Sequence, residues 1–117
     1  MDQFELATLI ENDLDEYIWI YLSYPKLSKI EREALYVEIL NGSEKAKNKL
    51  LLSSLKLPIL MAKKCARDIE EFIDYLHAGN LALFEALDSF SYKQGACFTR
   101  YANMLIKKSI VSVIAYS

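Results

Sequence analysis

Basic and aromatic side chains alternate within one short stretch in the last third of this chain. Tyr92 and Lys93 precede a glycine there, and Phe98, Arg100 and Tyr101 follow it. A single nucleic-acid strand offers phosphates to cations and unpaired bases to aromatic rings, and one stacked base is worth about 1–3 kcal/mol. The stretch therefore predicts a surface for single-stranded nucleic acid.

Each of these side chains also has a plainer explanation. Phe90 and Phe98 occupy positions where two helices joined by a turn need core rings, and the pattern favours the core for both. Lysines alone are more often solvated surface. For Tyr101, stacking on a base and packing in the core stay open. His77 has no carboxylate or cysteine partner that would indicate catalysis or metal binding, so we expect it at the surface.

Two amphipathic helices joined by a turn must position this stretch. Leu83, Leu87 and Phe90 recur at helical spacing, and a polar segment that ends in Gly95 follows them. The apolar side of the next helix is expected to carry Tyr101, Leu105, Ile106, Ile110, Val113 and Ile114. We expect these two long helices to pack together, with the earlier helices supporting them.

The first part of the chain contains clear helix boundaries. One acidic, aromatic helix is expected over residues 4–22, stopped by Pro25. Ser28 and Glu31 form a capping box that begins a second helix. Gly42 ends that helix, because glycine adopts the left-handed cap conformation without strain.

The middle of the chain predicts two further helical elements. Ser43 caps a long basic helix, and Pro58 inside its pattern predicts a kink or a break into two helices. Asp68 caps an element that leads into the helix of Leu83. With 3 Gly and 2 Pro the chain has little material for hairpin turns. The fold class is therefore all-α, a compact helical bundle.

Charge is distributed unevenly along the 117 residues, although the net charge is only −2. Residues 1–44 carry ten acidic and three basic side chains, whereas residues 45–117 carry six acidic and eleven basic ones. We expect a single domain over 1–117, with acidic N-terminal helices at 1–42 and a basic core at 43–117. The basic part suits nucleic acid, although an uneven solvated surface explains the charges equally well.

Several classes of protein do not fit the sequence. Cys65 and Cys97 form no CxxC motif, so we expect reduced cysteines rather than a disulfide framework or zinc site. The N-terminus lacks a signal-peptide profile, and no apolar run approaches a membrane span, so a cytoplasmic protein is expected. No catalytic constellation or phosphate-binding glycine loop can be assembled. We therefore expect no enzyme, no cofactor and no metal.

The motifs together resemble conserved region 2 of the sigma-70 family of bacterial sigma factors, the RNA polymerase subunits that recognise promoters. The resemblance rests on Asp74, Gly79-Asn80, Asp88-Ser89-Phe90, Gly95, Phe98-Thr99-Arg100-Tyr101-Ala102 and Ile106-Lys107-Lys108-Ser109-Ile110. The segment that precedes region 2 in the family, region 1.2, is matched in order by Asp15–Tyr21, Tyr24-Pro25, Ser28–Gly42 and Ala62-Lys63-Lys64. The likeness covers about residues 13–117.

This resemblance implies a sigma-like transcription initiation factor with two binding surfaces. Asp74, Asn80 and Phe84 would contact the coiled coil of the largest subunit of core RNA polymerase. The promoter −10 element would be recognised or melted through its single non-template strand. The DNA-binding residues that the resemblance implies are Tyr92, Lys93, Phe98, Arg100, Tyr101, Lys107 and Lys108.

The chain also departs from the family at positions that read DNA or contact polymerase. Met104 and Leu105 stand where primary sigma factors carry two tryptophans, and the other departures are Ser54, His77, Ala78, Ser91, Gln94 and Ala96. The family's domain for the −35 element has no counterpart in these 117 residues. These features favour an alternative function, a sigma-like regulator that binds polymerase or another transcription factor without melting DNA. An anti-sigma or co-regulator protein is a further possible partner. An unrelated helical bundle is the third alternative.

Overall fold

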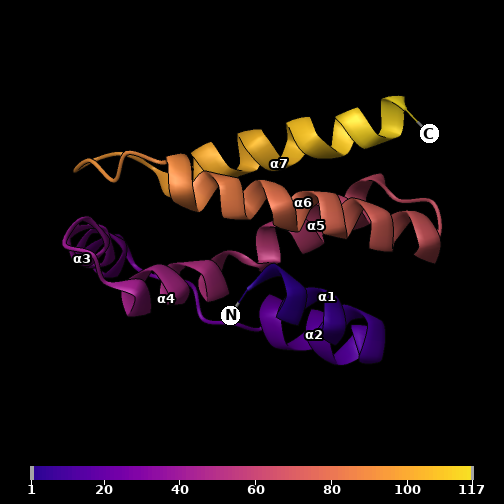
Figure 1. Ribbon diagram of the computed structural model, residues 1–117, viewed down its shortest axis with the longest axis horizontal. Helices are drawn as coiled ribbons and strands as arrows, with labels where there is room; N and C mark the ends of the chain where they lie inside the picture. The colour runs from indigo at the N-terminus through magenta and orange to yellow at the C-terminus, as the bar shows by residue number, and fades with distance from the viewer. Residues whose placement is uncertain (1, 117) are drawn as a thin grey trace.

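The computed structural model describes residues 2–116, which form seven α-helices and contain no strand. The helices are α1 (Gln3–Asn12), α2 (Leu14–Leu22), α3 (Lys29–Leu40), α4 (Glu44–Ser54), α5 (Lys56–Cys65), α6 (Ile69–Ser89) and α7 (Phe98–Ala115). The all-α prediction is confirmed. Figure 1 shows α6 and α7 side by side as the longest pair, with α1 to α4 gathered along one side of them.

The pair α6 and α7 makes the most extensive contact in the fold, and α5 packs against both helices. Gly79 permits the close approach of α5 to α6. A Cβ atom at Gly79 would lie 2.9 Å from Cβ of Pro58 and 3.4 Å from Cγ2 of Ile106. Any larger residue would force these three helices apart. The buried residues of α7 are Phe98, Ala102, Ile106 and Ile110, which lie one turn apart on one face.

The prediction of one helix over residues 4–22 is wrong, because the chain breaks at Asp13. The Asp13 backbone leaves the helical region at φ −155° and ψ 81°, and its N–H donates to the Leu9 carbonyl. Its carboxylate accepts from the Glu16 N–H at 3.1 Å and so caps α2. Aspartate competes well for such a cap, and one residue therefore separates α1 from α2.

The predicted break near Pro58 is confirmed, but it lies three residues earlier, at Leu55 between α4 and α5. Proline lacks the N–H that an uninterrupted helix would bond to the carbonyl of Ser54. Because the new helix begins at Lys56, Pro58 falls in its first turn, where no N–H partner is required.

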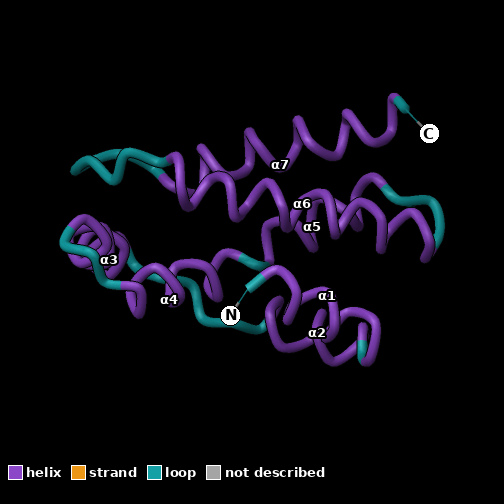
Figure 2. The backbone as a smooth tube through the Cα atoms, viewed as in Figure 1, coloured by secondary structure: helices purple, strands orange, loops and turns teal. Residues whose placement is uncertain are grey.

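The other predicted caps are confirmed. The Ser28 hydroxyl accepts from the Glu31 N–H and the Glu31 carboxylate accepts from the Ser28 N–H, each at 3.1 Å. Asp68 caps α6, which runs as one helix of 21 residues. The segment between α6 and α7 turns back at the end of the molecule where α3 lies, as Figure 2 shows. This placement brings α3 against the start of α7.

Candidate nucleic-acid interface

A cluster of aromatic rings holds together α3, the segment after α6 and the first turn of α7. Phe90 is its centre, with ring centroids 5.0 Å from Tyr92, 5.4 Å from Phe98, 5.5 Å from Tyr101 and 5.6 Å from Tyr36. Most of these pairs meet edge to face, the arrangement that the ring quadrupole favours. The stretch that the sequence predicted as an interface therefore packs on a cluster of aromatic rings centred on Phe90.

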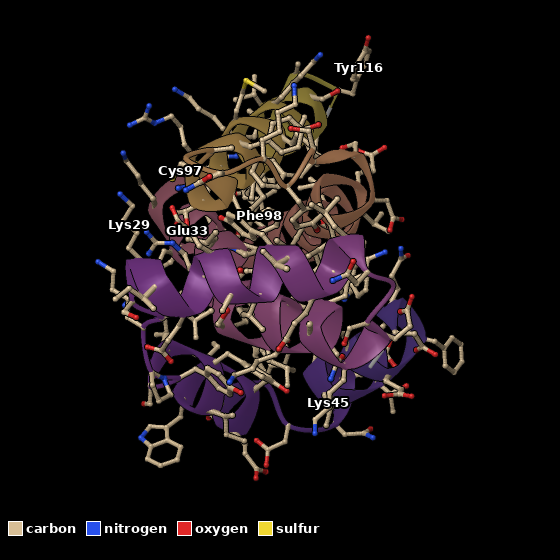
Figure 3. All side chains as sticks on the ribbon, turned by 90° about the vertical axis from the view of Figure 1, so that its left-hand side faces the viewer. Lys29, Glu33, Lys45, Cys97, Phe98 and Tyr116 are labelled. Atoms are coloured by element: carbon tan, nitrogen blue, oxygen red, sulfur yellow. The ribbon has the colours of Figure 1, made fainter. Side chains whose placement is uncertain are left out.

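The first turn of α7 is fixed by a side chain from another helix. Cys97 precedes α7 and supplies no side-chain cap. The Phe98 N–H instead donates to the hydroxyl of Tyr36 on α3, at 3.1 Å in a buried position. Figure 3 looks onto α3 and shows Phe98 behind that helix, with Cys97 above it on the same side as Lys29. Tyr36 thus orients the turn that carries Arg100 and Tyr101.

Two of the predicted DNA-binding rings lie in the core. Phe98 is 0% exposed and Tyr92 is 6% exposed, so neither presents a free ring face. Tyr92 has a positive φ of 50°, which turns its ring inward, and its hydroxyl donates to the Leu87 carbonyl at 2.6 Å. Burial, and then the charge of Asp88, raises the pKa of Tyr92 well above its usual value. Both rings pack against Phe90 in the core rather than offering a face to a base.

The remaining predicted DNA-binding residues are accessible. Tyr101 is half-buried, and its hydroxyl lies 2.6 Å from that of Ser89. Arg100 and Lys107 are exposed and seven residues apart, so they share one face of α7. Lys108 is exposed at the same spacing from Tyr101, and Lys93 is exposed on the preceding segment. None of these four cations makes an ion pair with any residue in the described range 2–116.

A basic cleft that reaches α7 at Thr99 was missed by sequence reasoning. It has a volume of about 310 Å³ and is lined by Lys26, Leu27, Arg32, Leu50, Ser53, Ser54, Lys56, Leu57 and Thr99. Its cations come from three separate segments, and its lining also includes the hydroxyl-bearing side chains of Ser53, Ser54 and Thr99. The sequence singled out only Ser54 here. No local motif could have identified the cleft, because only the packing of α3, α4, α5 and α7 brings these residues together.

Two of these cations are held in place by main-chain oxygens. Lys56 Nζ donates to the Tyr24 carbonyl at 3.2 Å, and Arg32 Nη1 donates to the Leu27 carbonyl at 3.1 Å. Both contacts are part-buried. Neither cation makes an ion pair with a carboxylate among residues 2–116, so each charge is available to a ligand. Such a cleft suits a phosphate and its attached base.

The three residues predicted to contact polymerase lie along α6 but differ in accessibility. Asp74 is exposed, and Phe84 is half-buried beside α4. Asn80 is only 6% exposed, and its Nδ2 donates to the Tyr17 hydroxyl at 3.2 Å. Burial raises the pKa of Tyr17 to about 12, so this hydroxyl stays neutral. The structure brings Asn80 and Phe84 to neighbouring turns and leaves Asp74 further along the helix.

Comparison with known proteins identifies the relatives of this chain. The RNA polymerase sigma factor SigA of Clostridium acetobutylicum is 33% identical over 106 residues, 87% of this chain and 28% of that protein. SigA of Lactococcus lactis subsp. lactis is 30% identical over 118 residues, 98% of this chain and 31% of that protein. This chain is homologous to a region of bacterial sigma factors. The sigma factor RpoD of Helicobacter pylori is 37% identical over 73 residues, 62% of this chain and 11% of that protein.

These relatives confirm the predicted sigma-factor family, and the assignment to region 2 within that family stays a prediction. The chain spans about 30% of the length of the SigA proteins that it matches. No protein-family model matches the chain. The described residues contain no group of three or more His, Cys, Asp or Glu that could hold a metal ion. Within residues 2–116, no helix is long and apolar enough to cross a membrane.

Proposed function

We propose that this sigma-factor homologue is a non-enzymatic transcription initiation module equivalent to region 2 with its preceding segment. It binds core RNA polymerase through α6 and holds the non-template strand of the promoter −10 element on α7. The observation that carries this proposal is the accessible side of α7, which presents Arg100, Tyr101, Lys107 and Lys108. The basic cleft reaches the start of the same helix at Thr99. Cations there meet phosphates while Tyr101 offers a ring to one base.

The aromatic cluster explains why Tyr101 is suited to this task. Phe90 packs on one side of Tyr101, and the Ser89 hydroxyl holds its phenol group. The ring is therefore already oriented before DNA arrives, which lowers the entropic cost of binding. A base that unstacks during melting loses a few kcal/mol, and stacking on Tyr101 offsets part of that loss.

The proposal is tested by strand binding with and without core polymerase. Labelled non-template strands and the matching duplexes are titrated at several salt concentrations. We expect a preference for the single strand, with log K falling by about 0.7 per neutralised phosphate for each unit of log salt. Replacing Tyr101 with alanine should cost about 1–3 kcal/mol of binding free energy. Tyr116→Ala is the matched control, because Tyr116 is a 91% exposed tyrosine at the other end of α7.

Polymerase binding is tested separately on α6. The double variant Asn80→Ala/Phe84→Ala should weaken binding to the coiled coil of the largest subunit. Ile69→Ala is the control, since Ile69 is exposed near the start of the same helix. If the folded double variant binds as well as the parent does, the docking surface is elsewhere on the molecule.

A second candidate function is a regulator that occupies polymerase without melting DNA. It is favoured because Tyr92 and Phe98 are buried, so that Tyr101 alone of the three predicted rings is accessible. Met104 and Leu105 also stand at positions where the primary sigma factors that the chain resembles carry two tryptophans. A polymerase complex that forms normally, shows no strand preference and ignores Tyr101→Ala would support this regulator and contradict promoter melting.

A further inference from the structure

The short helix α1 lies across the middle of α6. It is capped by Asp2, whose carboxylate accepts from the Glu5 N–H at 2.8 Å, and it is anchored by buried Leu6 and Ile10. Its other large apolar residues are exposed, Phe4 at 82% and Leu9 at 41%. Two buried side chains are thus the main attachment of α1 to the rest of the fold.

The contact between α1 and α6 leaves a cavity and two buried polar atoms without hydrogen-bond partners among residues 2–116. A cavity of about 210 Å³ lies there, lined by Gln3, Leu6, Ala7, His77, Asn80 and Leu81. Asn80 Oδ1 and His77 Nε2 are buried at this contact, and neither has a hydrogen-bond partner within residues 2–116. His77 is therefore half-buried, whereas the sequence predicted a surface residue. Burying polar atoms without partners costs free energy, so this closed arrangement is held less firmly than the core.

The same place is the centre of the proposed polymerase-docking surface. Asp74 and Phe84, at the two ends of that surface, remain at least partly accessible, but Asn80 between them is covered. A partner cannot bond to Asn80 Oδ1 while α1 lies over it. A partner that presents a hydrogen-bond donor there would supply the bond that the closed state lacks.

The joint between α1 and α2 allows one helix to move without the other. Asp13 alone separates them, and its carboxylate accepts from the Glu16 N–H within α2, a contact that involves no residue of α1. Tyr17 and Tyr21 of α2 are buried and keep that helix attached to the core. Rotation about the Asp13 backbone would lift α1 and leave α2 in position.

We propose that α1 is an autoinhibitory cover over Asn80, which the polymerase coiled coil displaces when it docks on α6. This inference rests on the proposed function, because the partner that lifts α1 is the polymerase proposed above. The closed state lowers the apparent affinity by the fraction of molecules that are open. If about one molecule in ten is open, full release of α1 strengthens binding about tenfold.

Hydrogen exchange of the unmodified chain tests the cover directly. Backbone amides are followed in the free chain and in its complex with core polymerase, because exchange reports local opening. We expect amides of α1 to exchange at least about tenfold faster in the complex, while those of residues 77–81 become slower. If α1 is equally or better protected in the complex, the cover does not open and the proposal is overturned.

Variants test the same inference through affinity. Leu6→Ala/Ile10→Ala removes the two anchors, and deletion of residues 2–12 removes the cover itself. Both should bind the coiled coil up to about tenfold more tightly than the parent, provided that circular dichroism shows them folded. Phe4→Ala/Leu9→Ala is the matched control, with two exposed apolar residues changed on the same helix, and should bind as the parent does.

The outcomes separate the cover from the proposed function. If the parent binds and Asn80→Ala weakens binding, but the folded release variants bind no more tightly, only the cover is overturned. If neither the parent nor the release variants bind the coiled coil, the polymerase-docking proposal fails and the cover fails with it.

Discussion

Replacing Tyr36 with phenylalanine removes one oxygen atom and leaves the ring that packs against Phe90 and Tyr92 in place. That oxygen accepts the hydrogen bond from the Phe98 N–H at 3.1 Å. Burial raises the pKa of Tyr36, and the bond from Phe98 only partly opposes this, so the hydroxyl is neutral at ordinary pH. The change thus removes the helix cap, together with the smaller contribution of Arg32 at the same hydroxyl, and leaves the ring packing in place.

The expected cost follows from what the N–H loses. A buried donor without a partner costs about 1–3 kcal/mol, and loss of a helix N-cap costs about 0.5–2 kcal/mol. Both figures describe the loss of the same hydrogen bond and are not added, so we expect a loss of about 1–2 kcal/mol in unfolding free energy. For a domain of this size, each kcal/mol lowers Tm by about 4 °C, which predicts a fall of about 4–8 °C.

Thermal and urea denaturation of Tyr36→Phe measure this loss, and strand binding measures its functional consequence. Because the freed turn carries Arg100 and Tyr101, strand affinity should fall as well. Tyr116→Phe removes a hydroxyl from an exposed tyrosine and should leave both measurements unchanged. Backbone hydrogen exchange in the first turn of α7 should also become faster. If Tyr36→Phe keeps the parent's stability and the parent's exchange rates in that turn, this account of how α3 orients α7 is refuted.

Three further predictions concern the core. Leu87→Ala should destabilise the domain by about 2–5 kcal/mol in urea denaturation, because Leu87 is buried and its loss leaves a cavity; an unchanged midpoint would contradict its place in the core. Gly79→Ala should cost about 1–3 kcal/mol despite the better helix propensity of alanine, since the new Cβ would lie 2.9 Å from Cβ of Pro58. Stability should also fall from about pH 10 to about pH 12, because burial raises the pKa of Tyr17 from 10.0 to about 12 and the unfolded chain then releases its proton first. A pH titration of unfolding should show a shallower fall in Tyr17→Phe, and an identical slope in parent and variant would remove Tyr17 from this effect.

Local signals in the sequence predicted most of the fold. The caps at Ser28, Ser43 and Asp68 were identified correctly because each depends on residues within one turn. The joint at Asp13 was missed although the same chemistry operates there. An aspartate inside an apolar helical period reads as part of a polar face, so the periodicity concealed the break.

The candidate site was predicted in part. The basic and aromatic stretch pointed to Arg100, and the resemblance to sigma region 2 added Lys107 and Lys108; all three are exposed. The sequence favoured the core for Phe98, which is buried, but it did not separate Tyr92 from Tyr101. These two side chains are chemically alike, and they differ in the backbone, which has a positive φ at Tyr92. The basic cleft around Ser54 could not be predicted from the sequence for a different reason. Its cations are brought together by segments that are distant in sequence.

The sequence by itself determined the helices, the acidic and basic parts and the family likeness, because each of these depends on residue types at short range. Only the tertiary structure decided which polar groups are covered. Asn80 is a neutral amide in a helix, and nothing near it in the chain indicates that Tyr17 and α1 would enclose it. Burial depends on contacts between distant segments, and those contacts form only when the whole core assembles.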